Sequence, residues 1–497
     1  MIDVALQAID AATGLGAAYA DARLLNAREQ GIVIRNGEVA TLADTESIGL
    51  GIRVIVNDAR GWGFWGFAAT DELTRPAVEA AAREAVAIGR ASALASDERM
   101  RLYLAPRPPV TDEWRSPAAQ DPFAVSLDRK ISLLMAVDAA VRRVPGVSLS
   151  RGYLSFTRLH KIFVSSDGAR ITQWLTYSGA GFDATSFRDG EIQKRSYPNS
   201  FGGQYQLKGY ELVDELALEA HAQRVGEEAV ALHGAAQCPQ RATTLILDSS
   251  QLGLQIHESI GHAIELDRML GYEANYAGTS FLTLPMLNSF EYGSPIVNVV
   301  ADATIAHGPG LGTFAYDDEG VPAQSVPIIT RGRLTGLLTS RETAAAVGAS
   351  RSGGSMRADG WNRIPLIRMT NVSLLPDAKG PATLDALIAD TDDGVYMETN
   401  RSWSIDDKRL HFQFGTEIGW EIKKGKRGRM LKNPSYGGIT PPFWRSCDAI
   451  CGPAAWTLWG TPNCGKGQPP QTIGTGHGAS PARFRNVDVG VAYDAEG

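Results

Sequence analysis

The most informative stretch of the sequence is His257-Glu258-Ser259-Ile260-Gly261-His262, in which two histidines bracket a glutamate in the pattern H-E-x-x-x-H. Imidazole nitrogens bind Zn²⁺ well, and a carboxylate beside the first ligand can accept a proton from water. On a regular α-helix, however, residues five apart point about 140° away from each other. The pattern indicates a metal site only if the helix widens locally; otherwise the two histidines are an accidental pair.

A metal site of this kind needs a third ligand, because a catalytic zinc usually has three protein ligands and one open position. Cys464 is the strongest candidate, since the Gly/Pro-rich segment 459–467 lets the backbone bring a thiolate close to a metal. Cys447 and Cys451 form a C-x₃-C pair without a second pair, which is a weak metal-binding pattern. The remaining candidates are Glu265, Asp267, His307, His411 and His477.

Acidic residues near the motif admit more than one interpretation. Glu265 lies three residues after His262, and either orients that histidine as a hydrogen-bond acceptor or is an ordinary carboxylate on the helix surface. Asp318 and Glu319 are candidates for supporting the metal ligands or for steering a substrate amine. Asp317, beside them, is interpreted as part of an acidic turn at the surface.

The composition excludes several classes of protein. The chain has 497 residues, enough for two or three domains, with 44% hydrophobic and 21% charged residues. Its 48 basic and 55 acidic residues give a net charge of −7, which argues against a nucleic-acid or membrane-surface partner. No signal peptide or membrane-spanning run is found, and four cysteines do not make a disulfide scaffold. We therefore expect a cytoplasmic location.

The hydrophobic pattern predicts an α+β protein with two halves. In residues 1–235, strand-like alternation with helical stretches predicts an antiparallel sheet with helices. This half divides further near residues 94–125, where Pro, Asp and Arg predict a linker or a surface excursion. Residues 236–497 are predicted to form a β-rich half that carries the helix with the H-E-x-x-x-H pattern.

Individual elements also have clear signals. Asn36-Gly37 predicts a hairpin turn, and Thr70 and Ser126 are candidate N-caps of helices. The helices expected in the first half are 3–13, 70–89, 126–143 and 212–232, and the strands are 19–29, 31–35, 39–42, 47–56, 61–68 and a strand region at 147–176. In the second half, the expected elements are a strand at 242–247, a motif helix capped by Asp248, Ser249 or Ser250, and a short helix at 343–347 among strands and loops.

Four segments together resemble the TldD/PmbA family of metallopeptidases, in its TldD branch. Residues 257–267 (H-E-S-I-G-H-A-I-E-L-D) are similar to its active-site segment, and residues 316–322 (Y-D-D-E-G-V-P) to its D-D-E-G-x-P loop. Residues 368–371 (R-M-T-N) and 463–466 (N-C-G-K) resemble two later motifs. The four motifs occur in the family's order, and the resemblance extends over nearly the whole chain.

The resemblance implies that His257, His262 and Cys464 bind Zn²⁺ and that Glu258 is the general base of a peptidase. It also implies a dimer that encloses a cavity for short or unfolded peptides, in which a TldD subunit pairs with a PmbA (TldE) relative. Residues 397–406 differ from the Gly-rich stretch of many members, and 441–458 look like an insertion. A homodimer is therefore as plausible as a heterodimer with a PmbA/TldE-like subunit.

Two other functions remain open from the sequence. One is a non-catalytic peptide-binding or assembly subunit with a structural zinc, in which Cys447, Cys451 or Glu265 would complete four ligands. The other is a cysteine hydrolase that uses Cys464 with a histidine base.

The metal hypothesis makes a prediction about the shape of the helix. For both histidines to reach one ion, the helix must widen between His257 and His262 into a single π turn with i→i+5 hydrogen bonding, and Gly261 would ease that turn. A regular α-helix there, with the two rings pointing apart, would contradict the hypothesis.

Overall fold

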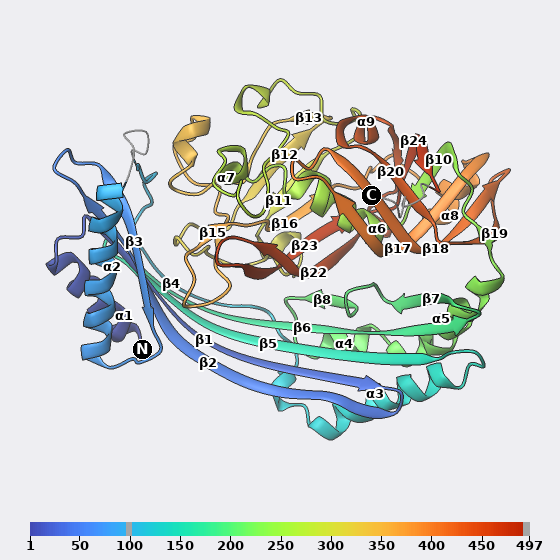
Figure 1. Cartoon of the computed structure of the whole chain (residues 1–497), viewed down its shortest axis with the longest axis horizontal. Helices are drawn as coiled ribbons and strands as arrows, with labels where there is room; N and C mark the ends of the chain where they lie inside the picture. Colours follow the sequence, from blue (N-terminus) through green and yellow to red (C-terminus); the bar gives the residue numbers. More distant parts are fainter. Residues whose placement is uncertain (96–101, 491–497) are drawn as a thin grey trace.

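The computed structural model describes residues 1–95 and 102–490, and its fold is α+β, as the sequence predicts. Figure 1 shows a long bent sheet beneath a β-rich half of the molecule. All strands of the bent sheet precede residue 207, and all strands of the other sheets follow residue 235. Among the described helices, none is long and apolar enough to cross a membrane.

The bent sheet has eight strands in the order β3-β2-β1-β5-β6-β4, with β7 and β8 also pairing with β6. Its strands pair antiparallel except for β4, which is parallel to β6. The strands are β1 (Tyr19–Arg35), β2 (Glu38–Asn57), β3 (Gly63–Thr70), β4 (Val110–Arg115), β5 (Leu149–Ser165), β6 (Ala169–Arg188), β7 (Glu191–Tyr197) and β8 (Gln204–Gln206).

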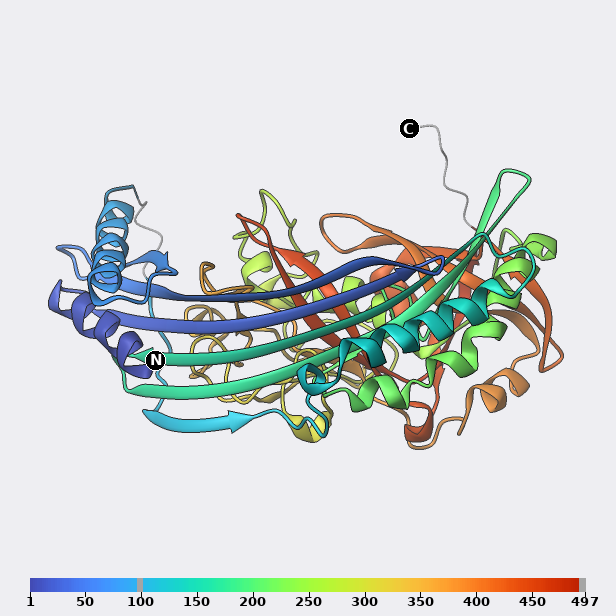
Figure 2. The same cartoon turned by 90° about the horizontal axis from the view of Figure 1, so that it is seen from below.

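Helices cover the outer face of this sheet in two groups, seen from below in Figure 2. One group packs at the end that holds β3, and the other packs along β5 and β6, each around its own hydrophobic cluster. The first group consists of α1 (Ile2–Gly14) and α2 (Arg75–Ala95), and the second of α3 (Leu127–Arg142), α4 (Glu211–Glu215) and α5 (Leu218–Ala231). The opposite, inner face of the bent sheet is therefore the one that faces the β-rich half.

The β-rich half contains two larger sheets and a two-stranded one. The eight-stranded sheet contains β9 (Ala236–Gln237), β10 (Arg241–Leu247), β17 (Asp393–Ile405), β18 (His411–Lys423), β19 (Lys426–Lys432), β20 (Ser435–Ile439), β21 (Cys447–Ile450) and β24 (Ala482–Val489). The six-stranded sheet contains β11 (Val299–Asp302), β12 (Ser325–Thr330), β13 (Arg333–Leu334), β16 (Asn371–Leu374), β22 (Thr457–Lys466) and β23 (Gln471–Ala479). The small sheet pairs β14 (Met356–Arg357) with β15 (Leu366–Ile367).

Helix α6 (Ser249–Ile256) lies between the two larger sheets and leads into the H-E-x-x-x-H motif. It contacts β17 of one sheet and β16, β22 and β23 of the other, and all of its residues are buried. The other helices of this half are α7 (Leu266–Met269), α8 (Leu384–Ala389) and α9 (Thr440–Arg445). Short 3₁₀ turns cover Pro122–Ala124, Leu232–Gly234, Leu284–Met286, Ile305–His307, Ala344–Val347 and Pro453–Ala455.

Several local predictions are confirmed. Asn36-Gly37 forms the β1–β2 turn with φ of 48° and 84°, and Ser126 caps α3 through a hydrogen bond from the amide of Arg129. Asp248 is the cap of α6, since its carboxylate accepts hydrogen bonds from the amides of Ser250 and Gln251 at 2.8 and 3.0 Å.

Other local predictions were wrong. The predicted interruptions within β1 and β2 do not occur, because pairing with neighbouring strands continues along their whole length. Thr70 ends β3 rather than capping α2, which begins five residues later at Arg75, with Pro76 in the first turn, where proline fits. The helix expected at 212–232 is broken at Ala217, which adopts the left-handed conformation.

The region expected to be a linker, 94–125, contributes β4 to the edge of the bent sheet, and its residues 96–101 lie outside the described part of the chain. In the second half, the stretch at 343–347 forms only a 3₁₀ turn, and helices α8 and α9 were missed. Helix α9 has two prolines directly after its first residue, Thr440; they fit a first helical turn, but in the sequence they resemble a loop.

A buried ion network joins the bent sheet to the β-rich half. Arg53 of β2 pairs with Asp21 of β1 at 2.7 Å and with Glu319 of the β-rich half at 3.2 Å. The backbone amide of Arg341 also donates to Glu319, at 2.7 Å. All three side chains of the ion network are at most 4% exposed, so removal of the arginine would leave two desolvated carboxylates without the cation that pairs with both.

We therefore expect R53M to lower the unfolding free energy by about 3–5 kcal/mol, the cost of an uncompensated buried charge. The matched control is R28M, because Arg28 pairs with Asp44 at the surface and such a pair contributes at most about 1 kcal/mol. Thermal unfolding followed by circular dichroism checks both variants. Equal, small shifts of the melting temperature in R53M and R28M would contradict the role given to Arg53.

A candidate metal centre on the buried helix

The helix widens where the spacing of the two histidines requires it to. Residues His257–Gly261 form a π turn, and the amide of His262 donates to the carbonyl of His257, five residues earlier, at 3.1 Å. A Cβ atom at Gly261 would lie 2.0 Å from Sδ of Met369, so a larger residue at this position would displace that side chain. The expectation of a π turn is confirmed, and both imidazoles lie on the same side of the helix.

Three potential metal ligands meet at this turn. Donor atoms of His257, His262 and Cys464 all lie within 4.8 Å of one another, and all three residues are buried. The Nε2 atom of His262 lies 3.7 Å from Sγ of Cys464. Two ligands of a tetrahedral zinc, bound at about 2.0–2.3 Å, are roughly 3.3–3.7 Å apart, so this separation fits one shared ion. Two imidazoles and a thiolate are also a donor set that zinc prefers.

His477 fixes the tautomer of His257. Its Nδ1 lies 3.0 Å from the carbonyl of Val372, which can only accept, so this nitrogen carries the proton. Burial and the neighbouring His257 hold the pKa of His477 well below its usual value, so its Nε2 is an acceptor. His257 Nδ1, at 2.8 Å, must then be the donor, which leaves its Nε2 free for a metal. His477 is therefore a supporting residue and not the third ligand that the sequence also allowed.

Glu265 fixes the tautomer of His262 in the same way. Its carboxylate accepts hydrogen bonds from His262 Nδ1 at 3.0 Å and from Arg268 Nε at 2.7 Å. Although burial opposes ionisation, Lys466 and the other cations around Glu265 hold its pKa well below the ordinary value. Glu265 is completely buried, so its interpretation as a surface carboxylate was wrong. Asp267, another ligand candidate, instead binds Lys466 at 2.7 and 2.8 Å.

Both imidazoles are in the form that binds metal. Burial lowers the pKa of His257 and of His262 to about 4, so both rings are neutral at pH 7. Burial alone would raise the pKa of the Cys464 thiol, but His262 and the Arg368 guanidinium together bring it below its usual value. Cys464 lies in β22 rather than in the expected loop, and a bulge between Thr461 and Cys464 interrupts the strand pairing there.

Glu258 lies within the same π turn and is paired with a cation that the sequence did not reveal. Arg409 Nη1 donates to its carboxylate at 2.7 Å, and the two side chains are 15% and 8% exposed. Arg409 follows Glu258 by 151 residues and lies between β17 and β18, so no local pattern connects the two.

The remaining candidates lie elsewhere. Asp318 pairs with Lys161 at 2.5 Å and with Arg23 at 3.6 Å, and Glu319 belongs to the network around Arg53, so neither contacts the three donors. Asp317 is 2% exposed, and the surface interpretation of this turn was wrong. His307 lies near Asp302, with Nδ1 3.8 Å from its carboxylate, and His411 is exposed.

The C-x₃-C pair does not join the cluster either. The thiols of Cys447 and Cys451 lie 3.9 and 3.5 Å from the backbone carbonyls of Ala449 and Thr383. Burial raises the pKa of both thiols, that of Cys451 to about 11, which disfavours the thiolate that a metal needs.

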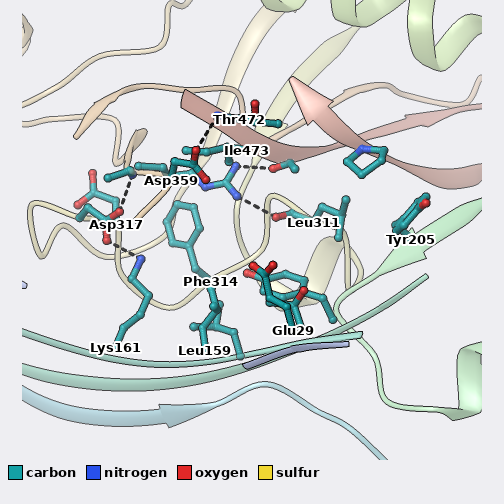
Figure 3. A pocket seen from close by; sticks show the side chains of 18 of the residues that line it. Glu29, Leu159, Lys161, Tyr205, Leu311, Phe314, Asp317, Asp359, Thr472 and Ile473 are labelled. Atoms are coloured by element: carbon teal, nitrogen blue, oxygen red, sulfur yellow. Dashed lines mark hydrogen bonds and ion pairs between the residues drawn. The ribbon is translucent and has the colours of Figure 1, made fainter. Parts of the chain in front are cut away.

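A cavity of about 290 Å³ lies between the bent sheet and the hairpin that carries Cys464. Figure 3 shows Leu159 and Lys161 from the sheet facing Phe314 and Ile473 of the β-rich half across it. Ile473 is the register partner of Cys464, so the cavity adjoins the strand that bears the thiol. It combines apolar walls with several charged groups, as sites for organic ligands do.

Comparison with known proteins gives matches over most of the chain. Three consecutive segments match domains of the PmbA/TldA metallopeptidases: domain 1 over residues 20–89, the central domain over 120–233 and the C-terminal domain over 240–490. A metalloprotease of Methanothermobacter thermautotrophicus is 29% identical over 472 residues, which are 95% of both chains. A zinc metalloprotease TldD homolog of Saccharolobus solfataricus is 28% identical over 196 residues, 39% of this chain and 41% of that one.

A solved structure shares the whole fold. The crystal structure of TldE from Thermococcus kodakarensis superposes with a TM-score of 0.72 over 98% of this chain and 99% of that one, at 14% sequence identity. At this identity, the likeness is one of fold alone.

The hydrogen bond between His477 and His257 leads to a prediction. H477F should keep the fold and weaken zinc binding about 10- to 100-fold, because a metal-bound histidine loses affinity when the partner of its second nitrogen is removed. The control is H411F, at an exposed histidine outside the cluster. Competition with a chromophoric chelator measures both affinities, and an unchanged zinc affinity in H477F would contradict the tautomer argument.

Proposed function

The chain belongs to the PmbA/TldD metallopeptidase family, and on this premise we propose that it is a zinc-dependent peptidase of the TldD type. The observation that carries the proposal is the convergence of His257, His262 and Cys464, with Glu258 in the same turn. Two neutral imidazoles and a thiol of lowered pKa form a set of three donors, which leaves a tetrahedral ion one open position.

Each residue has a definite part in peptide hydrolysis. His257, His262 and Cys464 would hold the zinc, which supplies a Lewis acid for the scissile carbonyl and for the attacking water. Glu258 accepts the proton of that water and then delivers it to the leaving amine. His477 and Glu265 keep the two imidazoles in the tautomers that point Nε2 towards the metal.

The cavity beside the Cys464 strand is the proposed site for the peptide. Its volume of about 290 Å³ accommodates a few residues of an extended chain and excludes a folded protein. The donors of the cluster are themselves buried. A short or unfolded peptide is therefore the substrate class that fits, and the apolar walls around Phe314 would receive its side chains.

We also propose that the subunit works as a dimer, either with a PmbA/TldE-like partner or with a second copy of itself. The support is the fold shared with TldE from Thermococcus kodakarensis over 98% of this chain. The mass of the native assembly, purified without a tag from its own cell, separates the two arrangements.

The geometry around His257, His262 and Cys464 favours one of the two alternative functions, the cysteine hydrolase, over the structural zinc. A structural zinc would need a fourth protein ligand, but Cys447 and Cys451 face other carbonyls and Glu265 binds His262. A cysteine hydrolase has more support, because His262 Nε2 lies 3.7 Å from Cys464 Sγ and Glu265 orients that ring. Dialysis against a chelator removes the metal. A cysteine hydrolase would stay active after this treatment, whereas a zinc peptidase would lose its activity until zinc was restored.

E258Q tests the proposed mechanism. The variant should retain zinc, because Glu258 is not among the three donors, and should cleave peptides at least 100-fold more slowly, because an amide cannot take the proton. Mass spectrometry of a set of unstructured synthetic decapeptides measures cleavage, and E291Q, at an exposed glutamate, is the control. Full turnover by zinc-loaded E258Q would refute the general-base role.

A further inference from the structure

Arg409 is held by a fixed turn between β17 and β18. Its amide donates to the carbonyl of Asp406 at 2.9 Å, and the next amide, of Leu410, donates to the Asp406 carboxylate at 2.7 Å. Arg409 has a φ of 65°, in the left-handed region that costs energy for a residue other than glycine. The hydroxyl of Thr440 donates to its carbonyl at 2.9 Å. This backbone fixes the direction in which the guanidinium leaves the turn.

A second segment braces the same turn. The amides of Thr279 and Phe281 donate to the carbonyls of Asp407 and Lys408 at 2.9 and 2.8 Å. Gly278 fits between them because a Cβ atom there would lie 2.5 Å from the carbonyl oxygen of Asp407. The turn at 406–409 and the segment 277–281 therefore form one rigid wall beside Glu258.

Only some of the N–H donors of the Arg409 guanidinium have hydrogen-bond partners. Nη1 donates to Glu258 at 2.7 Å and Nη2 to the carbonyl of Ala277 at 3.3 Å, a carbonyl that also accepts from Arg268. Nε of Arg409 is buried and has no hydrogen-bond partner among the described residues. A buried donor without a partner costs about 1–3 kcal/mol, and a catalytic role is one of the reasons for which a protein keeps such a group. The missing partner must be an acceptor, because every guanidinium nitrogen donates.

We propose that Arg409 is a catalytic residue that donates to the carbonyl oxygen of the scissile peptide bond and stabilises the negative charge that develops on it. The inference rests on the proposed peptidase function, and it adds a residue from outside the motif to the reaction. Glu258 and the substrate carbonyl must both be near the attacking water, so a cation already bonded to Glu258 is within reach of that oxygen.

The charge balance of the reaction supports this role. As the water oxygen bonds to the carbonyl carbon, the π electron pair moves to the carbonyl oxygen and a proton moves to Glu258. The negative charge facing Arg409 is thus transferred from Glu258 to the substrate oxygen, while the arginine stays protonated. When the C–N bond breaks, Glu258 gives its proton to the amine and recovers its pair with Arg409. The interaction with substrate is strongest in the transition state, as catalysis requires.

The test compares steady-state cleavage of the same decapeptides by zinc-loaded wild type, R409M, R409K, R409A, E258Q and the control R445M. Arg445 is an exposed arginine that donates to the carbonyl of Glu291 and lies over the ring of Phe290. R409M should lose about 10²- to 10³-fold in kcat, the usual loss when one oxyanion donor is removed, with KM changed less than about threefold. Zinc content and the circular dichroism spectrum should match the wild type, and guanidinium ion added to R409A should restore part of kcat.

Several outcomes would overturn the inference. An unchanged kcat in R409M, or a loss confined to KM, would make Arg409 a structural or binding residue. If R409M fails to fold, R409K decides: a selective fall in kcat supports the inference, and an unchanged kcat overturns it. An active E258Q would defeat the proposed function itself, whereas an inactive E258Q beside a fully active R409M would remove only the role of Arg409.

Discussion

The hydrogen bond from the amide of His262 to the carbonyl of His257 is the interaction on which the candidate site depends. It joins residues five apart, and so brings to one side two side chains that a regular helix would point apart. The turn persists because the surroundings determine it: α6 is buried between two sheets, and Met369 occupies the space that a side chain at position 261 would need. The unusual spacing of the motif is thus the signature of this turn.

The residues that hydrogen-bond to the two histidines explain why the site is buried so deeply. Each histidine uses one ring nitrogen for a protein acceptor, His477 or Glu265, and keeps the other for the proposed metal. These bonds define a tautomer only if water does not compete, and burial also holds both rings neutral at pH 7. The buried cations Lys466 and Arg268 keep Glu265 ionised. The chemistry therefore depends on residues of the six-stranded sheet, such as His477 and Lys466, and the cavity beside Cys464 further depends on the bent sheet.

The sequence predicts those parts of this arrangement in which the interacting residues are close together along the chain. The π turn followed from the histidine spacing and Gly261, and Glu265 could be suspected from its position one turn after His262. His477 and Arg409 act across 220 and 151 residues, and only the folded sheets bring them to the motif. The acidic run at Asp317 resembled a surface turn because its cations, such as Arg53, lie in the other half of the molecule. For the same reason, the full length of β1 and β2 depends on pairing that no local pattern contains.

The central claim is that two histidine nitrogens and one cysteine sulfur hold a single zinc ion. X-ray absorption at the zinc edge of the purified protein tests it most directly, because the first shell distinguishes sulfur from nitrogen by distance. The account predicts one sulfur at about 2.3 Å and two or three nitrogen or oxygen neighbours at about 2.0–2.2 Å, with the sulfur contribution lost in C464A. A zinc shell without sulfur, or with two or more sulfurs, would contradict the account.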